Sequence, residues 1–232
     1  MINYINNSII AIIPARGGSK GIPGKNKKDF LGKPLVSHSI DYAMSGLKKE
    51  SIYLSTDDDD IKEIGLNKGI KIVDRPSNLA SDEATTESAI DHVLDNCVIL
   101  PEIIILLQPT SPLRPENSFN KLIEYFVSAQ FDSLLTISPT HRFFWQIKGI
   151  NATPLYDFNN RPRRQDMKED DIKYIENGSV YAFTFNHFKK TGNRLGGKIG
   201  YYIFPEEYSI ELDSISDWTY LESIGKSIKD QL

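Results

Sequence analysis

The chain has 232 residues, 40% of them hydrophobic, and a formal net charge of −4 at neutral pH. This is enough apolar chain for one large α/β domain or a domain with an appendage, and the acidic balance excludes a general nucleic-acid binder. Cys97 is the only cysteine, no apolar run approaches the ~18 residues of a membrane span, and the first seven residues lack the basic region of a signal peptide, so we expect a cytoplasmic protein without disulfides or membrane contact.

The first half of the chain alternates short apolar runs with amphipathic segments. Residues 9–13 and Ile103–Leu107 are continuously apolar, which predicts strands covered on both faces. Thr56-Asp57 offers an N-cap for a helix that reaches Lys68. The other predicted strands are 52–55, 71–73, 133–138, 179–185 and 200–204, and the other predicted helices are 35–47, 84–98, 116–129 and 217–228. This order predicts right-handed crossovers and a Rossmann-like, doubly wound, mostly parallel α/β sheet.

The pattern changes after Pro139. Residues 140–175 mix aromatic, proline and charged residues with no clear period, and they include the basic run at 161–165. A segment of this length and weak periodicity is more typical of an insertion or an interface arm than of a plain loop. We therefore expect an α/β domain formed by residues 1–139 and 176–232, and an inserted segment at 140–175.

A glycine-rich basic loop follows the first predicted strand. Glycines let backbone N–H groups approach an anion, and Arg16, Lys20 and Lys25 add positive charge, so the loop predicts a polyphosphate site. The loop lacks the Gly-Lys-Ser/Thr ending of a Walker A loop and the G-x-G-x-x-G of dinucleotide binders, which disfavours a Rossmann dehydrogenase. The alternative is a flexible basic surface turn.

Two more loops are predicted at the same edge of the sheet, because ligands of doubly wound sheets lie beyond the carboxyl ends of the strands. These are Ser55-Thr-Asp57 and the rigid turn that begins at Gln108. The acidic run 57–60 has a structural interpretation as helix-capping charge.

One signature and five further motifs, in order, resemble those of the acylneuraminate cytidylyltransferases, also called CMP-sialic acid synthetases. The resemblance covers nearly the whole chain and implies a fold of the nucleotide-diphospho-sugar transferase type. It also implies an enzyme that couples CTP to a nine-carbon α-keto acid sugar, by in-line attack of the anomeric hydroxyl on the α-phosphorus, with pyrophosphate leaving. The motifs are Pro14-Ala-Arg-Gly-Gly-Ser-Lys-Gly-Ile-Pro-Gly-Lys-Asn26 with Ser55-Thr-Asp57, Arg75-Pro-Ser-Asn-Leu-Ala-Ser-Asp82, Leu107-Gln-Pro-Thr-Ser-Pro-Leu-Arg114, Ile175-Glu-Asn-Gly-Ser-Val-Tyr181 and Ser209-Ile-Glu-Leu-Asp213.

The resemblance also implies roles for individual residues. Arg16 and Lys25 are expected to hold the CTP phosphates, and Lys25 is expected to stabilise charge in the transition state. Thr86 stands where a serine is familiar in the family, and a structural salt bridge is the alternative for Arg75. The expected nucleotide-binding residues are Arg16, Gly18, Ser19, Lys20, Lys25, Asn26, Arg75 and Thr86.

The expected sugar-binding residues are Gln108, Trp145, Arg163, Arg164 and Asn177. Trp145 lies in the segment where sialic acid enzymes of the family bring in a lysine from the partner subunit, so a homodimer is expected. An aromatic cluster favours a methyl over a hydroxyl. We therefore hypothesise a 9-deoxy sugar, legionaminic acid or a relative such as pseudaminic acid; the alternative is that these aromatics only pack the dimer interface. Arg163 or Arg164 could bind a carboxylate or a phosphate bidentately.

Glu211 and Asp213 form a candidate Mg²⁺ site. On an extended segment, residues two apart point to one face, and Mg²⁺ takes few carboxylates together with substrate phosphate oxygens. The family usually has Asp at both positions. Two other functions stay open: a cytidylyltransferase for 3-deoxy-octulosonate or a polyol phosphate, and a non-catalytic nucleotide-sensing module.

Overall fold

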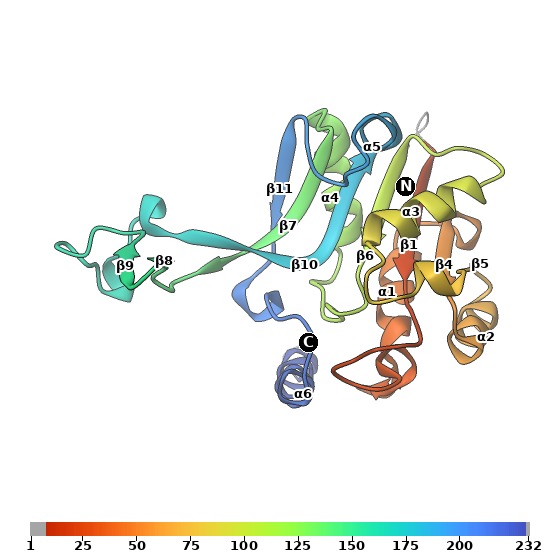
Figure 1. Cartoon of the computed structure of the whole chain (residues 1–232), viewed down its shortest axis with the longest axis horizontal. Coiled ribbons are helices and arrows are strands. Elements are labelled where there is room, and N and C mark those ends of the chain that lie inside the picture. The colour runs from red at the N-terminus through yellow and green to blue at the C-terminus, as the bar shows by residue number, and fades with distance from the viewer. Residues whose placement is uncertain (1–7, 231–232) are drawn as a thin grey trace.

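A seven-stranded sheet forms the centre of the protein, in the order β11-β7-β10-β6-β1-β4-β5 (Figure 1). The computed structural model describes residues 8–230. Strands β1, β4, β5 and β6 are parallel to one another, as are β7 and β11, and β10 runs antiparallel between β6 and β7. The predicted mostly parallel α/β sheet is confirmed. Its strands are β1 (Ile9–Pro14), β4 (Ile52–Thr56), β5 (Lys71–Asp74), β6 (Ile103–Leu107), β7 (Ser133–Thr140), β10 (Lys173–Thr184) and β11 (Ile199–Ile203).

Helices cover both faces of this sheet. Alternate residues of β1 explain its continuous apolar run, because Ala11 and Ile13 pack in the core under α1, α2 and α4, whereas Ile10 and Ile12 pack under α3 and α5. The helices are α1 (Leu35–Met44), α2 (Asp59–Lys68), α3 (Thr86–Asp95), α4 (Ser118–Ser128), α5 (Phe185–Thr191) and α6 (Ile215–Lys229).

A third, smaller core lies under the carboxyl edge of the sheet. It joins α6, through Trp218 and Leu221, to Phe30, Leu35 and the fully buried Leu212. Phe30 belongs to a short hairpin that the sequence did not predict, formed by β2 (Asp29–Phe30) and β3 (Lys33–Pro34). This core fixes the position of the segment that carries Leu212.

Several predicted boundaries differ from the structure for local reasons. The N-cap of α2 is Asp58 rather than Thr56-Asp57, because the Asp58 carboxylate accepts the N–H of Ile61 at 3.0 Å. The helix α6 begins two residues earlier than predicted, since Ser214 and Asp217 form a capping box. The short helix α5 was not predicted.

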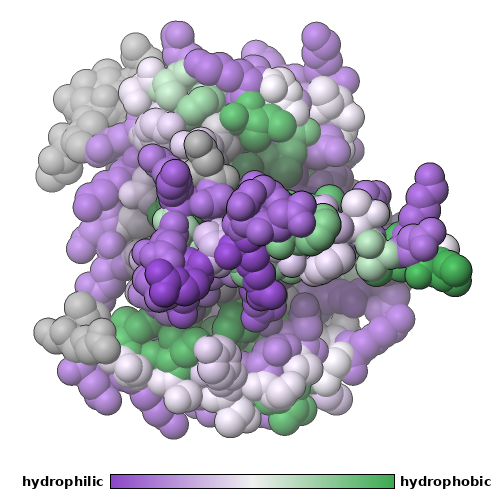
Figure 2. All heavy atoms as spheres, turned by 90° about the vertical axis from the view of Figure 1, so that its left-hand side faces the viewer, coloured by the Kyte–Doolittle hydropathy of each residue, from purple (hydrophilic) through white to green (hydrophobic). Residues whose placement is uncertain are grey.

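Residues between β7 and β10 form an arm that projects from the sheet (Figure 1). Pairing of Thr140 with Lys173 holds its base, and the hairpin β8 (Trp145–Lys148) and β9 (Asn151–Pro154) lies farther out. The side chains of β8 are exposed on both faces, so the hairpin has no hydrophobic period for the sequence to show. Figure 2 looks onto the arm from its tip and shows hydrophilic side chains there, with hydrophobic ones beside it.

Residues 1–7, where no signal peptide is expected, lie outside the described residues. Within residues 8–230, no helix combines the length and the apolar character that crossing a bilayer requires.

Candidate active site

A cavity of about 470 Å³ lies at the carboxyl edge of the central strands. It collects predicted residues from four separate loops and from the start of α3. Sequence positions far apart therefore meet at one polar, cationic site, as the doubly wound topology requires. The predicted residues that line it are Arg16, Ser19, Lys20, Lys25, Asn26, Arg75, Thr86, Gln108 and Asp213.

The basic loop is held in shape by its own polar side chains. The Asn26 amide donates a hydrogen bond to the backbone oxygen of Arg16 at 2.9 Å, which closes the loop. The backbone N–H of Gly17 donates to the Asp57 carboxylate, also at 2.9 Å, which ties the loop to the end of β4. Asn26 thus organises the loop. The N–H of Gly17, a backbone donor of the predicted phosphate-binding loop, is bonded to Asp57 instead.

The Lys25 side chain links the basic loop to the acidic segment formed by residues 211–213. Its ammonium donates to the backbone oxygen of Leu212 at 2.6 Å and to an Asp213 carboxylate oxygen at 3.3 Å. Only 11% of the Lys25 side chain is exposed, so its charge acts in a partly desolvated place where electrostatic interactions are stronger than in water.

Gly21 permits the contact between these two segments. A Cβ atom at this position would lie 2.0 Å from the backbone oxygen of Asp213. No side chain fits there, so glycine at position 21 is required for the basic loop to lie against the acidic segment.

Arg75 lies buried at the floor of the cavity. Its guanidinium donates to the hydroxyl of Ser55 at 3.0 Å and to the Ser55 backbone oxygen at 2.6 Å. Burial lowers the pKa of Arg75 to about 10. Among the described residues no carboxylate lies within ion-pair distance of Arg75, so the structure does not support the alternative of a structural salt bridge.

Asp82 is a site residue that the sequence motif contained but that we assigned no role. One of its oxygens accepts a hydrogen bond from Arg16 at 2.9 Å, and the other lies 2.9 Å from the Lys20 ammonium. The hydrogen bond from Lys20, and to a smaller extent the one from Arg16, holds the pKa of Asp82 below its usual range. Asp82 lies more than sixty positions after Arg16 and Lys20, so no local pattern in the sequence predicts these contacts.

Glu211 and Asp213 flank Leu212 beside the cavity. A Cβ on Gly178, whose φ is +60°, would lie 2.5 Å from the Glu211 carboxyl carbon, so that carboxyl packs against the Gly178 backbone. Partial burial of the Glu211 carboxylate raises its pKa, and the negative charges of Asp213 and Glu176 raise this pKa further by a smaller amount.

This carboxylate pair fits a divalent cation that also binds the substrate. The described residues contain no cluster of three or more His, Cys, Asp or Glu side chains able to hold a metal by themselves. Magnesium is commonly held by one or two carboxylates together with phosphate oxygens, and the mutual repulsion between Glu211 and Asp213 is what a cation would relieve.

Some predicted residues lie away from this cavity. Gly18 lines an adjoining shallow hollow of about 270 Å³. Trp145 is half-exposed on the arm and packs edge-on against Tyr156. Arg163 pairs with Asp166 at 2.5 Å, and Arg164 lies 3.4 Å from Glu206. Within one chain, the arm residues Trp145, Arg163 and Arg164 are therefore not part of this cavity.

Asn177 is fully buried in a bulge of β10 rather than lining the cavity. Its side-chain oxygen accepts hydrogen bonds from the Thr136 hydroxyl at 2.6 Å and from the Ser179 N–H at 3.2 Å, and its amide donates to Ser138. Asn177 thus stabilises the bulge beside Glu211.

Gln108 is held at the end of β6 through its backbone. Its carbonyl oxygen accepts a hydrogen bond from Arg114 at 2.9 Å, and its N–H donates to the Ser179 oxygen at 3.3 Å. Burial lowers the pKa of Arg114 to about 10. No role was predicted for Arg114, which holds the turn that carries Gln108.

A family model described as cytidylyltransferase matches residues 10–227. The chain is 34% identical over 221 residues to an N-acylneuraminate cytidylyltransferase of Oncorhynchus mykiss, covering 92% of this chain and 49% of that protein. It is 32% identical over 219 residues to one of Streptococcus agalactiae, covering 91% and 52%. It is 29% identical over 226 residues to a pseudaminic acid cytidylyltransferase of Campylobacter jejuni, covering 94% and 96%. The chain thus spans about half of the first two relatives.

Solved structures share the fold. A CMP:2-keto-3-deoxy-manno-octonic acid synthetase complexed with CTP superposes with a TM-score of 0.66 over 95% of this chain and 99% of that one, at 16% identity. A 4-diphosphocytidyl-2C-methyl-D-erythritol synthase from Anaerococcus prevotii gives the same TM-score at 17% identity, covering 95% of this chain and 96% of that one. At these identities the likeness supports the fold alone.

Proposed function

The chain belongs to the cytidylyltransferase family, and from that premise we propose that it transfers the cytidylyl group of CTP to a nine-carbon α-keto acid sugar. The anomeric oxygen of the sugar forms a bond to the α-phosphorus while the bond to pyrophosphate breaks, and the hydroxyl proton leaves to solvent. The observation that carries this proposal is the cavity in which Arg16, Lys20 and Lys25 meet buried Arg75 and Asp213. The names of the long relatives and of the pseudaminic acid enzyme agree with it.

The chain's own residues contribute mainly position and charge. We assign the triphosphate to Arg16, Ser19 and Lys20 and the nucleoside to Arg75 and Thr86, as the family resemblance implies, and all five residues line the one cavity. In-line transfer needs little covalent help from the protein, so fixed cations and the exclusion of water supply most of the rate enhancement. Lys25, largely buried and anchored at 2.6 Å, is suited to meet charge that develops on the phosphate oxygens.

We further propose that Glu211 and Asp213 hold Mg²⁺. Magnesium would neutralise charge on the phosphate oxygens and on the leaving pyrophosphate. The support for this assignment is the donor set: two neighbouring carboxylates, one with a raised pKa, beside an anchored lysine.

The proposed sugar is a 9-deoxy nonulosonic acid such as legionaminic or pseudaminic acid. The support is the aromatic group on the arm, in which Tyr156 packs against both Phe143 and Trp145. Because these residues lie outside the nucleotide cavity of their own chain, we propose a homodimer in which the arm of one chain reaches the site of the other. We also propose a cytoplasmic location, since a single cysteine suits a reducing compartment.

One assay tests the reaction and the sugar together. Purified protein is given CTP, Mg²⁺ and, in parallel, legionaminic, pseudaminic and N-acetylneuraminic acids and 3-deoxy-octulosonate, and pyrophosphate release is measured. We expect release only with sugar and the highest kcat/KM with a 9-deoxy sugar. A preference for N-acetylneuraminic acid would contradict the sugar assignment. A preference for 3-deoxy-octulosonate would favour the neighbouring cytidylyltransferase class, and no release with any sugar would favour a nucleotide-sensing module.

A further inference from the structure

We propose that Asp82 competes within the chain for the phosphate-binding cations Arg16 and Lys20, and that this competition speeds the release of pyrophosphate. The inference rests on the proposed function, because it assigns a role to a third residue at the same site.

The geometry of Asp82 is that of a bridging anion. One carboxylate oxygen lies 2.9 Å from the Arg16 guanidinium, and the other lies 2.9 Å from the Lys20 ammonium. A phosphate group bridging these two cations would use two oxygens in the same manner. The carboxylate therefore occupies the contacts that we assign to the phosphates.

The backbone next to Asp82 reinforces this closure. The Arg16 guanidinium also donates to the backbone oxygens of Ser81, at 2.8 Å, and Ala80, at 3.3 Å. Arg16 is thus turned toward the segment 80–82, and a polyphosphate must exchange with that segment to engage the guanidinium fully. When the polyphosphate leaves, the same segment can recapture both cations.

The exposure of these side chains makes the exchange easy. The side chains are exposed by 31% for Arg16, 46% for Asp82 and 77% for Lys20. Ion pairs that are open to solvent are weak, so a multivalent phosphate displaces Asp82 readily. A buried pair would lock the site instead. The structure therefore favours a competitor that weakens phosphate binding moderately, which suits the turnover of a product carrying several negative charges.

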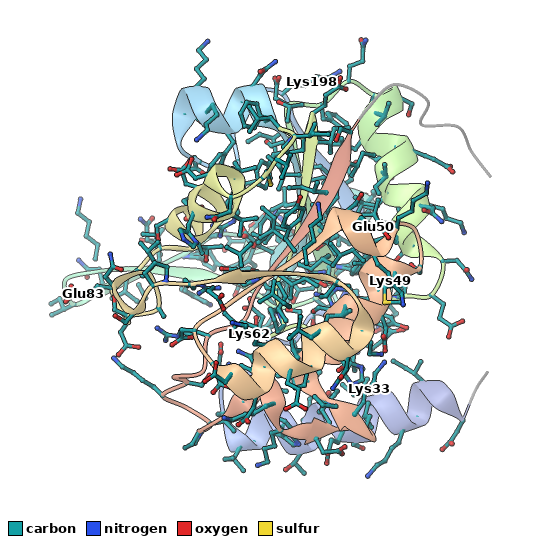
Figure 3. The ribbon with its side chains drawn as sticks, turned by 90° about the vertical axis from the view of Figure 1, so that its right-hand side faces the viewer. Lys33, Lys49, Glu50, Lys62, Glu83 and Lys198 are labelled. Atoms are coloured by element: carbon teal, nitrogen blue, oxygen red, sulfur yellow. The ribbon has the colours of Figure 1, made fainter. Side chains whose placement is uncertain are left out.

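Glu83 provides a matched control for Asp82. It follows Asp82 directly in the chain, and Figure 3 shows it at the outer tip of the loop, directed away from the body. Among the described residues no salt bridge involves Glu83. Glu83→Gln removes one negative charge from the same loop without touching Arg16 or Lys20.

Isothermal titration calorimetry with inorganic pyrophosphate, at low salt and without Mg²⁺, tests the inference on the full chain. We expect Asp82→Asn to bind pyrophosphate on the order of tenfold more tightly than the wild type, the size of two exposed ion pairs. Affinity for cytidine, which has no phosphate, should stay unchanged, and Glu83→Gln should match the wild type. In a Lys20→Met background the effect of Asp82→Asn should shrink.

Three outcomes would overturn the inference. Asp82→Asn could bind pyrophosphate no more tightly than the wild type, Glu83→Gln could give the same gain, or cytidine could gain as much as pyrophosphate. The first would make Asp82 an organiser of the loop, and the other two would indicate a general effect of charge or folding. Product inhibition gives a second readout, since pyrophosphate should inhibit Asp82→Asn at lower concentration. None of these results depends on sugar turnover, so a failure of the proposed reaction is seen separately.

Discussion

The Lys25 ammonium donates a hydrogen bond to the backbone oxygen of Leu212, 2.6 Å away and 187 positions later in the chain. Leu212 is fully buried and stands between the two carboxylates proposed to bind Mg²⁺. One bond thus sets the distance between the cationic loop and the acidic segment. The proposed phosphate site and the proposed metal site are therefore in direct contact.

Replacing Lys25 with alanine should lower kcat by about 10²- to 10³-fold, the usual effect of removing one charge-stabilising donor. Steady-state release of pyrophosphate measures this. Lys28→Ala is the matched control, because the Lys28 ammonium lies 4.9 Å from the centre of the Trp218 ring and outside the cavity lining. Turnover of Lys25→Ala within threefold of the wild type would remove Lys25 from this role.

Gly21→Ala should lower the free energy of unfolding by about 1–3 kcal/mol, because the new methyl collides with the Asp213 backbone. Thermal unfolding should show a fall in Tm of roughly 2–10 °C. Gly18→Ala is the comparison, since a Cβ there meets no atom within 4 Å and should leave Tm unchanged. Equal Tm values for the two variants would show that the loops do not touch as described.

Removing divalent cations with EDTA should abolish pyrophosphate release, and added Mg²⁺ should restore it. Asp213→Asn and Glu211→Gln should raise the Mg²⁺ concentration needed for half-maximal activity, because each loses one negative ligand. Full activity in EDTA would contradict the proposed metal site. An unchanged Mg²⁺ requirement in both variants would place the ion elsewhere.

Mixing two inactive variants tests whether the arm acts on the partner chain. The variant Lys25→Ala has a defective cavity and an intact arm. The double variant Arg163→Ala/Arg164→Ala has an intact cavity and a defective arm. Co-expressed chains that exchange arms should recover up to about one quarter of wild-type activity, because half of the random dimers carry one complete site of two. No recovery, with dimers shown by light scattering, would mean that each arm serves its own chain or no site.

Stability should fall between pH 6.5 and pH 4 in a way that depends on His38. Burial lowers the pKa of His38 to about 4 from an ordinary value of 6.5, while a hydrogen bond to the Phe30 backbone oxygen opposes this. In this window the unfolded chain binds the proton and the folded chain does not, so acid favours unfolding. His38→Gln should remove about 1–2 kcal/mol of this loss, measured by urea unfolding at pH 7 and pH 4.5. Parallel pH profiles for both proteins would rule out this contribution.

The sequence predicted the central parallel strands β1, β4 and β6 well because they are buried on both faces. Ile103–Leu107 reads as one apolar run for this reason, and every residue in it is buried. The antiparallel direction of β10 and the hairpin on the arm depend on long-range pairing and not on local pattern. Residues exposed on both faces leave no period to read.

The candidate site shows the same division. Arg16, Lys25 and Arg75 lie in recognisable motifs, and the structure brings them to one cavity. Asp82 and Arg114 lie in those motifs too, but Asp82 pairs with Arg16 and Arg114 donates to Ser39 and Ser179, all of which are far away in the chain. The sequence also could not predict that Asn177 lies in a bulge, because its hydrogen-bond partners Thr136 and Ser138 come from β7.

Strand β10 is twelve residues long and continues from the arm into the central sheet, with its irregularity between Glu176 and Tyr181. Because one continuous strand links the arm to the sheet, bending of the arm at the bulge would displace the Gly178 backbone. The Glu211 carboxyl packs against that backbone, so such bending would shift a proposed metal ligand.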